Sequence, residues 1–405
     1  MAERCDIAIV GAGIAGATLA ALLAEGPWSV VLLDGAPPPR PGARPGLRVS
    51  ALTRASEEVF VEAGAWGAMA GRAGPIRAMR VWEDGVETVF DSAEIGEPHL
   101  GHIVENDVVV AALLARLADS GRVAHRPGVA VVDLAATPRG PRLGLAGGAA
   151  LEARLVVAAD GAASPVRRLA GIPFPGWSYG QHALVARVTT AAPHRQTAWQ
   201  RFLPGGPLAF LPLADGASSI VWSLPSPEAR RLAACEPPDF EAELTEAFQG
   251  RLGQVALAGG RAIFPLAMRH AQAYWREGIA LIGDAAHRIH PLAGQGANLG
   301  VGDAGALAEC LLAGHAAGRA PGHPRDLGRW ARWRRESNLQ VMAAMEGFAQ
   351  LFGPLPLPLA VARRWGMGLF GALGPVKRWA MRRASGLAGD LPRAARPHYD
   401  RDPCA

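Results

Sequence analysis

Residues 6–34 carry the pattern that most restricts how this chain can fold. The apolar segment 6–10 is followed at once by a glycine-rich hexapeptide, then by an alanine- and leucine-rich stretch, 17–25, and a second apolar segment, 29–33. Strand, tight turn, helix and strand in this order predict a βαβ unit that binds a dinucleotide. The glycines at 11, 13 and 16 would make the turn, admit a pyrophosphate and pack helix on strand, and Asp34 would accept from a ribose. This pattern does not separate FAD from NAD.

Two later segments also place an acidic residue at the end of an expected strand. Leu155–Ala158 leads to Asp160-Gly161, and Ile279–Ile282 leads to Gly283-Asp284. Ligands of a doubly wound sheet lie outside the carboxyl ends of its strands, so Asp34, Asp160 and Asp284 are expected to converge on one crevice. After Asp284 comes a Gly-rich turn and a helix of small residues, whose free N–H groups and positive dipole suit an anionic cofactor. A second Gly-x-Gly-x-x-Gly, at 300–305, lies inside that helix and predicts close packing.

The middle of the chain has a different sequence pattern. Between 177 and 264, short apolar runs alternate with Pro- and Gly-containing turns, which predicts an antiparallel sheet, with one helix at 240–249. Asp84-Gly85 between two alternating runs predicts a hairpin that joins this sheet. Such a sheet would wall a pocket over the cofactor. Phe210, Trp222 and Phe264 are candidate wall residues, with aromatic core packing as the alternative for each.

Composition excludes several classes of protein. Of 405 residues, 50% are hydrophobic and 19% charged, which is typical of a globular chain. The net charge of +5 comes from scattered bases without a nucleic-acid-binding signature, so nucleic acid is not an expected partner. Four dispersed cysteines predict neither disulfides nor a metal site and favour a reducing cytoplasm. Charged residues directly before the first strand argue against a signal peptide, and no run of 18 apolar residues predicts a spanning helix.

Three motifs together carry a family resemblance. They are GAGIAG at 11–16, ADGAASPVR at 159–167 and IGDAAHRIHPLAGQGANLG at 282–300. The set resembles the single-component flavoprotein aromatic hydroxylases related to p-hydroxybenzoate hydroxylase. LRVSAL at 47–52, HLGHIVEN at 99–106, HALVA at 182–186, FLPL at 210–213 and FPL at 264–266 narrow the resemblance to the bacterial ubiquinone-biosynthesis hydroxylases, which act on a prenylated phenol. It extends over residues 5–350.

The resemblance implies FAD as the cofactor and assigns residues to it. Asp34 would hold the adenosine ribose, Arg48 and Asn106 would approach the flavin and its phosphate linker, and Asp160 would tie the cofactor region to the next helix. Asp284 would bond the ribityl chain, and Pro291 would lie against the flavin ring. N–H groups of Gly296, Ala297 and Asn298 would face the N1–C2 edge and stabilise the reduced anion. Further members of the implied site are Gly11, Ala12, Gly13, Ile14, Ala15, Gly16, Val129, Gly283, Gly294 and Gln295.

The implied fold is α/β, α+β overall: a Rossmann-like FAD-binding domain, an inserted antiparallel β-sheet substrate domain and C-terminal helices. The expected boundaries are 1–75, 99–176 and 265–346 for the FAD-binding domain, 76–98 and 177–264 for the substrate domain, and 347–405 for the tail.

The implied reaction uses NADH or NADPH to reduce FAD. O₂ then forms a flavin hydroperoxide, which transfers OH to an electron-rich phenol. No side chain is assigned as catalytic, and no metal is expected, so His287 and His290 would shape the turn. A ubiquinone-biosynthesis complex is an expected partner. The alternatives are hydroxylation of a soluble aromatic compound, or a catalytically silent flavin-binding subunit.

The C-terminal segment 347–389 is apolar and basic. It contains two tryptophans and clustered arginines, and no acidic residue occurs from 348 to 389. Tryptophan with clustered cations on short helices predicts contact with an anionic membrane surface. The alternative is a helical cap over the core. The expected location is the cytoplasm, with peripheral attachment to the inner face of the membrane as an extension of the tail hypothesis.

Overall fold

A computed structural model describes residues 3–42, 46–289, 295–352 and 357–397. Its first layer is an eight-stranded sheet in which β1 (Glu3–Val10) lies centrally. Parallel pairing joins β1 to β2 (Val30–Asp34) and to β11 (Ala150–Ala158), and continues outward to β8 (Val123–Pro127) and β18 (Ile279–Leu281). The sheet is completed by β9 (Val131–Thr137), β10 (Gly140–Leu145) and β17 (Trp275–Arg276). The carboxyl ends of its parallel strands therefore meet at one edge, as a dinucleotide fold requires.

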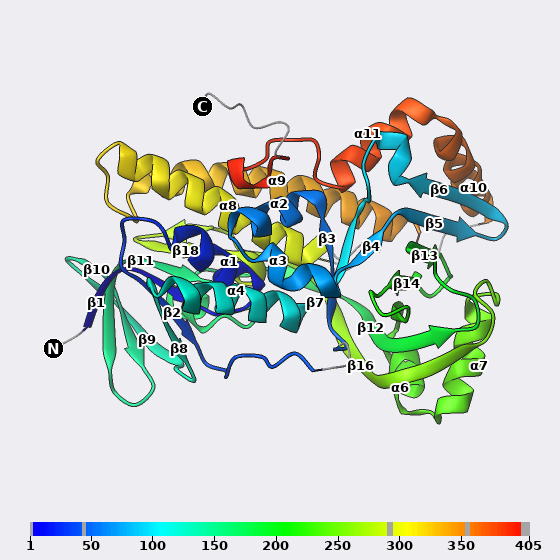
Figure 1. Cartoon of the computed structure of the whole chain (residues 1–405), viewed down its shortest axis with the longest axis horizontal. Coiled ribbons are helices and arrows are strands. Elements are labelled where there is room, and N and C mark those ends of the chain that lie inside the picture. Colours follow the sequence, from blue (N-terminus) through cyan, green and yellow to red (C-terminus); the bar gives the residue numbers. More distant parts are fainter. Residues whose placement is uncertain (1–2, 43–45, 290–294, 353–356, 398–405) are drawn as a thin grey trace.

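Helices cover this sheet because its strands are apolar on both faces. Ile7, Ile9, Leu32 and Val156 are fully or almost fully buried, which leaves no polar face for water. The covering helices are α1 (Ile14–Leu23), α4 (Asn106–Ser120), α8 (Gln295–Ala316) and α9 (Pro324–Leu351), with the shorter α2 (Arg54–Glu62), α3 (Trp66–Met69) and α5 (Pro165–Leu169). In Figure 1 the long α8 and α9 run side by side across the top of the molecule.

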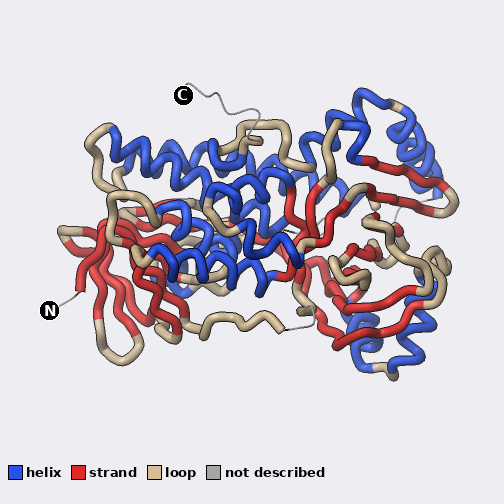
Figure 2. The backbone as a smooth tube through the Cα atoms, viewed as in Figure 1, coloured by secondary structure: helices blue, strands red, loops and turns tan. Residues whose placement is uncertain are grey.

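The second layer is the antiparallel sheet predicted for the middle of the chain. Its strand order is β19-β16-β12-β15-β14-β13-β5-β6. The strands are β5 (Ala78–Glu83), β6 (Val86–Asp91), β12 (Gly176–Thr190), β13 (Thr197–Arg201), β14 (Leu208–Pro212), β15 (Ser218–Pro225), β16 (Val255–His270) and β19 (His287–Arg288). The predicted hairpin is confirmed, since β5 and β6 pair across Asp84-Gly85, and β5 pairs in parallel with β13. Figure 2 shows these strands gathered at the opposite end of the molecule from β1.

Smaller elements connect the layers. A three-stranded sheet joins β3 (Val49–Thr53), β7 (Gly101–Glu105) and β4 (Gly74–Ile76), and the 3₁₀ turns are η1 (Ala70–Arg72), η2 (Ser92–Ile95), η3 (Gly283–Ala285) and η4 (Arg393–Ala395). The outer face of the antiparallel sheet carries α6 (Ser226–Ala234) and α7 (Pro237–Ala247), where one helix was predicted. The predicted fold class is confirmed by this mixture of parallel and antiparallel sheets with helices, while the domain boundaries stay a prediction.

The tail forms helices that pack on the hairpin. After α9 the chain continues as α10 (Leu357–Ala372) and α11 (Gly374–Ala384), and α10 lies against β6. Lys377 pairs with Glu94 at 2.7 Å, and Arg363 pairs with Glu83. Within the part of the chain that the structure describes, no helix combines the length and apolar character needed to cross a bilayer.

Candidate functional site

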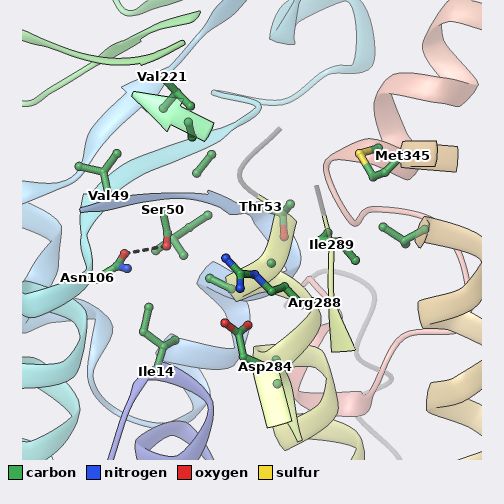
Figure 3. A pocket seen from close by; sticks show the side chains of 18 of the residues that line it. Ile14, Val49, Ser50, Thr53, Asn106, Val221, Asp284, Arg288, Ile289 and Met345 are labelled. Atoms are coloured by element: carbon green, nitrogen blue, oxygen red, sulfur yellow. Dashed lines mark hydrogen bonds between the residues drawn. The ribbon is translucent and has the colours of Figure 1, made fainter. Parts of the chain in front are cut away.

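One cavity of about 2240 Å³ extends from the dinucleotide fold to the tail helices. Its polar half is lined by the carboxyl ends of the parallel strands, and its apolar half by the antiparallel sheet and by α9–α11. Figure 3 shows its middle, where Asp284, Asn106 and Arg288 come from three different elements. A single space therefore connects the predicted cofactor site to the predicted substrate layer.

The three strand-end aspartates all line this cavity, which confirms that they converge. Asp34 also braces the glycine turn, because its carboxylate accepts from the N–H of Ala12 at 2.6 Å and of Ala36 at 2.7 Å. Asp160 accepts from the N–H of Val166 at 3.1 Å. Its other oxygen is buried without a hydrogen-bond partner among the described residues, and burial raises the pKa of this carboxyl. Asp160 thus lines the cavity and keeps one oxygen that no described residue satisfies, which fits a ligand that donates a hydrogen bond there.

The glycine turn has the shape that a pyrophosphate needs. Gly11 has φ +104°, and a Cβ there would lie 2.3 Å from the carbonyl oxygen of Ala159, so only glycine fits. A Cβ on Gly16 would lie 1.9 Å from the Gly11 oxygen, which explains how closely α1 follows β1. At Gly13 a Cβ would meet no atom within 4 Å, and the backbone opens to the cavity together with Ile14 and Ala15. These residues fit an FAD pyrophosphate at the start of α1.

The start of α8 contributes backbone rather than side chains. Gly296 and Ala297 line the cavity, and their position near the flavin stays a prediction. The side chain of Asn298 fastens α8 to neighbouring elements: it accepts from the N–H of Thr53 at 3.0 Å and donates to the Ala51 carbonyl at 2.8 Å. Gln295 begins the helix. Pro291, Gly294 and His290 lie outside the described residues, so their predicted roles stay predictions.

Asn106 lies on the cavity wall as the first residue of α4. The helix N-cap is Glu105, so capping, which was the alternative role for Asn106, is not what this side chain does. Its Oδ1 accepts from the hydroxyl of Ser50 at 2.7 Å (Figure 3). Arg48 and Val129 also line the cavity, and the Val129 N–H donates to the Asp34 carbonyl at 2.8 Å. Which of these residues touch FAD stays a prediction.

Only one of the three predicted aromatic wall residues faces the cavity. Phe264 lines it, and the Arg48 guanidinium carbon lies 5.6 Å from the centre of its ring. For Phe210 and Trp222 the prediction is wrong, because side chains alternate along a strand. Their neighbours in β14 and β15 line the cavity, whereas Phe210 and Trp222 belong to the core on the opposite face. There Phe210 stacks on Phe248, with ring centroids 3.9 Å apart.

A buried charge network behind the Gly283-Asp284 turn was not predicted. Asp303 of α8 is fully buried and accepts from the Gly283 N–H at 3.1 Å and from the Arg334 Nε at 2.9 Å. His287 Nε2 lies 2.6 Å from Asp303, and Asn338 donates to it at 2.9 Å. Burial raises the pKa of the Asp303 carboxyl, but the charges of His287 and Arg334 lower it further, to about 2. The signal in the sequence was an aspartate within the small and apolar stretch 299–308 of that helix, since a buried carboxylate requires a partner.

Comparison with known proteins identifies the family to which the chain belongs. The model of the FAD binding domain family matches residues 4–325. The chain is 38% identical to 3-demethoxyubiquinol 3-hydroxylase of Escherichia coli, over 95% of this chain and 99% of that protein. It is also 38% identical to ubiquinone hydroxylase UbiL of Rhodospirillum rubrum, over 96% and 92%. The chain belongs to the FAD-dependent ubiquinone-biosynthesis hydroxylases. The mitochondrial ubiquinone biosynthesis monooxygenase COQ6 of Danio rerio is 34% identical, over 95% and 90%.

Solved structures show the same fold. The p-nitrophenol 4-monooxygenase PnpA of Pseudomonas putida superposes with a TM-score of 0.79 at 20% identity, covering 94% of this chain and 98% of that one. PqsL of Pseudomonas aeruginosa superposes with a TM-score of 0.75 at 25% identity, covering 90% and 99%. These structures show the fold, and the family model and the sequence relatives show that the chain is an FAD-dependent monooxygenase, with NAD(P)H as the reductant typical of its family.

Proposed function

We propose that this protein hydroxylates the aromatic ring of a prenylated phenol or hydroquinone in ubiquinone biosynthesis. Bound FAD would supply the redox chemistry, with NADH or NADPH and O₂ as co-substrates. The observation that carries the proposal is the continuity of the cavity between a dinucleotide crevice and a long apolar half. A ring at the junction would reach the flavin while its chain lies in the apolar half.

The side chains of the apolar half suit an isoprenoid chain. Met79 and Val81 of β5 line it, as do Phe348 and Phe352 near the end of α9. Phe352 stacks on Phe202, the residue directly after β13, with ring centroids 3.6 Å apart. Burial of each chain CH₂ there would contribute about 0.8 kcal/mol, so a chain of several isoprene units would dominate substrate affinity. The same apolar walls exclude water from the reacting groups. A small soluble aromatic compound would leave this half of the cavity empty.

Complementation tests the pathway. The gene is expressed in bacterial strains that each lack one ring hydroxylase of ubiquinone biosynthesis, and quinone intermediates are identified by mass. Recovery of ubiquinone in one strain, with loss of the intermediate that strain accumulates, supports the proposal and identifies the ring position. Failure to rescue every strain despite soluble, FAD-containing protein contradicts it and favours a soluble aromatic substrate or a silent subunit. Membership of a biosynthetic complex is part of the same proposal, and co-purification from the rescued strain tests it.

We also propose that the tail contacts an anionic membrane surface. Trp365 and Leu369 of α10 and Trp379 of α11 are 77%, 61% and 63% exposed, beside the exposed Arg378 and Arg383. Exposed apolar side chains with clustered cations suit a headgroup interface. Trp379 also lines the cavity, so the apolar end of the cavity opens beside this exposed surface. A substrate dissolved in the bilayer could then enter the cavity from there, and the tail would serve both as a cap over the substrate layer and as a membrane contact.

Vesicle flotation tests this contact without removing the cavity lining. Trp365 and Leu369 do not line the cavity, so the double variant W365S/L369S is expected to keep its FAD and its activity on a detergent-dispersed substrate. Binding to vesicles containing phosphatidylglycerol should fall about 10-fold or more relative to wild type, because two exposed apolar side chains no longer enter the interface. Unchanged flotation of the double variant would contradict the membrane contact.

A further inference from the structure

The basic residues that line the cavity differ in their surroundings. Arg363 of α10 pairs with Glu83 of β5, and Arg383 of α11 donates to Gln340 of α9. Arg48 lies over the ring of Phe264. Arg288 is placed differently, because it follows the Gly283-Asp284 turn and forms part of β19. It thus stands where the dinucleotide fold meets the antiparallel sheet.

Arg288 is held on that boundary by the antiparallel sheet. β19 pairs with β16, and the Arg288 guanidinium donates from Nη2 to the carbonyl of Pro265 at 2.6 Å. Pro265 and Phe264 are adjacent on the cavity wall, so Arg48 and Arg288 bring two guanidinium groups to the same point of one strand. Figure 3 shows the Arg288 side chain directed into the cavity above Asp284. One of its five N–H groups is used on Pro265, which leaves others for a ligand.

The described cavity wall offers no obvious base for a phenol. No His, Tyr, Glu or Lys lies among the described lining residues, and Arg288 is the one ionisable side chain that the antiparallel sheet contributes to them. The lining carboxylates, Asp34, Asp107, Asp160 and Asp284, belong to the dinucleotide half. A phenol at the junction therefore meets the Arg288 guanidinium on the side of the antiparallel sheet, with Asp284 of the dinucleotide half below it. An adjacent cation favours the ionised form of an acid, and hydrogen bonds to an anionic oxygen are about twice as strong as neutral ones.

We propose that Arg288 is a catalytic residue that binds the phenolic oxygen of the substrate and holds it as the phenolate. This inference rests on the proposed prenylphenol substrate. The O–H bond of the phenol breaks, its proton passes to water, and the electron pair stays on the oxygen, facing the guanidinium. The guanidinium acts by its charge and by hydrogen bonding and takes no proton from the phenol. The phenolate ring is richer in electrons than the phenol and is the better acceptor of an electrophilic oxygen.

The ionisation of the bound phenol can be measured directly with a phenol whose absorbance changes when it ionises. The probe is 4-nitrophenol with a farnesyl chain next to its hydroxyl, added to the FAD-loaded enzyme without NADH and titrated with pH. Wild type should raise the acid ionisation constant of the bound probe about 10-fold over that of the free probe. R288Q should lose this gain. R288K should keep part of it, because lysine retains the charge but not the planar fork.

Arg269 supplies a matched control. It lies opposite Arg288 in the β16–β19 pair, is exposed, and donates to the Phe174 carbonyl at 3.3 Å. It does not line the cavity, so R269Q should ionise the probe as wild type does. In turnover, R288Q should lower kcat and move the rise of kcat to higher pH, and R269Q should not.

Three results would overturn the assignment. R288Q and wild type could ionise the bound probe equally. R288Q could weaken FAD binding, measured by flavin fluorescence, and leave the probe's ionisation unchanged, which would assign the arginine to the cofactor. R288K and R269Q, both with full FAD content, could lose the ionisation of the probe as completely as R288Q does. That loss would indicate a structural effect. Failure of FAD-loaded wild type to bind the probe would contradict the proposed substrate class itself, separately from any Arg288 variant.

Discussion

Asp303 is the residue on which the geometry of the strand end most depends. It joins α8 to α9 through Arg334 and Asn338 and holds the Gly283 N–H, which sets the turn that presents Asp284. A buried charge is tolerated only when paired and hydrogen-bonded on all sides, and this carboxylate is. Removing its charge would leave Arg334 buried without an anion.

Replacement of Asp303 by asparagine should therefore be strongly destabilising. D303N is expected to lower the free energy of unfolding by about 3–5 kcal/mol and to weaken FAD binding, because the turn loses its support. The control is D215N, which breaks the more exposed pair with Arg187 and should cost about 1 kcal/mol or less. Urea unfolding and flavin fluorescence measure both effects. Equal stability of D303N and D215N would contradict the role given to Asp303.

His99 gives a pH dependence of known sign. It lies in a cluster with His102, Glu57 and Arg54, where Arg54 donates to Glu57 at 2.6 Å. Burial, followed by the charge of His102, lowers the pKa of His99 from 6.5 to about 4. The unfolded chain then binds a proton that the folded protein does not, so the free energy of unfolding falls as pH decreases from 6.5 to about 4.

H99Q should have a shallower pH dependence than wild type in that interval. The difference in slope is at most about 1.4 kcal/mol per pH unit, the value for one proton. Burial likewise lowers the pKa of His270 to about 4, so H99Q should keep part of the dependence. Urea unfolding at several pH values checks this, and identical slopes for the two proteins would disprove it.

At the scale of elements, α8 is held close to the cofactor turn by glycine. A Cβ on Gly300 would lie 3.1 Å from the Ala15 Cβ and 3.2 Å from the Gly283 Cα. The second Gly-x-Gly-x-x-Gly was predicted to serve helix packing. Gly300 meets α1 and the turn, Gly302 meets Arg334, and Gly305 meets Pro392, which confirms that prediction.

G300A should separate α8 from this turn. Overpacking typically costs about 1–3 kcal/mol, and FAD affinity should fall about 10-fold because Gly296 and Ala297 move with the helix. Gly67 of α3 is a suitable control, since a Cβ there meets nothing within 4 Å and G67A should leave both quantities nearly unchanged. Wild-type FAD affinity in G300A would show that α8 can shift without affecting the site.

The period of the hydrophobic residues and the residues found in turns explain which elements could be predicted from the sequence. The βαβ unit, the hairpin at Asp84-Gly85 and the converging strand ends each follow from local patterns. Helix α6 was missed because only Ala229 and Leu232 are buried, which is too weak a stripe to recognise. Phe210 and Trp222 were assigned to the wrong face because period two identifies two faces but not which of them faces the ligand.

At the scale of the whole molecule, the tail depends on contacts that no local pattern encodes. Arg363 and Lys377 reach Glu83 and Glu94, which lie more than 250 residues earlier in the chain. These pairs turn one side of α10 and α11 toward the cavity and leave Trp365 and Leu369 exposed. The sequence indicated an apolar, basic segment, but which side of its helices covers the hairpin depends on these pairing partners. The buried network around Asp303 was missed for the same reason.

The central claim is that the two halves of the cavity act on one prenylated substrate. Purified FAD-loaded enzyme is given NADH, isotopically labelled O₂ and a farnesylated phenol, and the product is analysed by mass spectrometry. The account predicts one labelled oxygen on the ring, and a kcat/KM at least about 100-fold higher than for the same phenol without its chain. NADH oxidation that yields only hydrogen peroxide, or equal turnover of the two phenols, would contradict it.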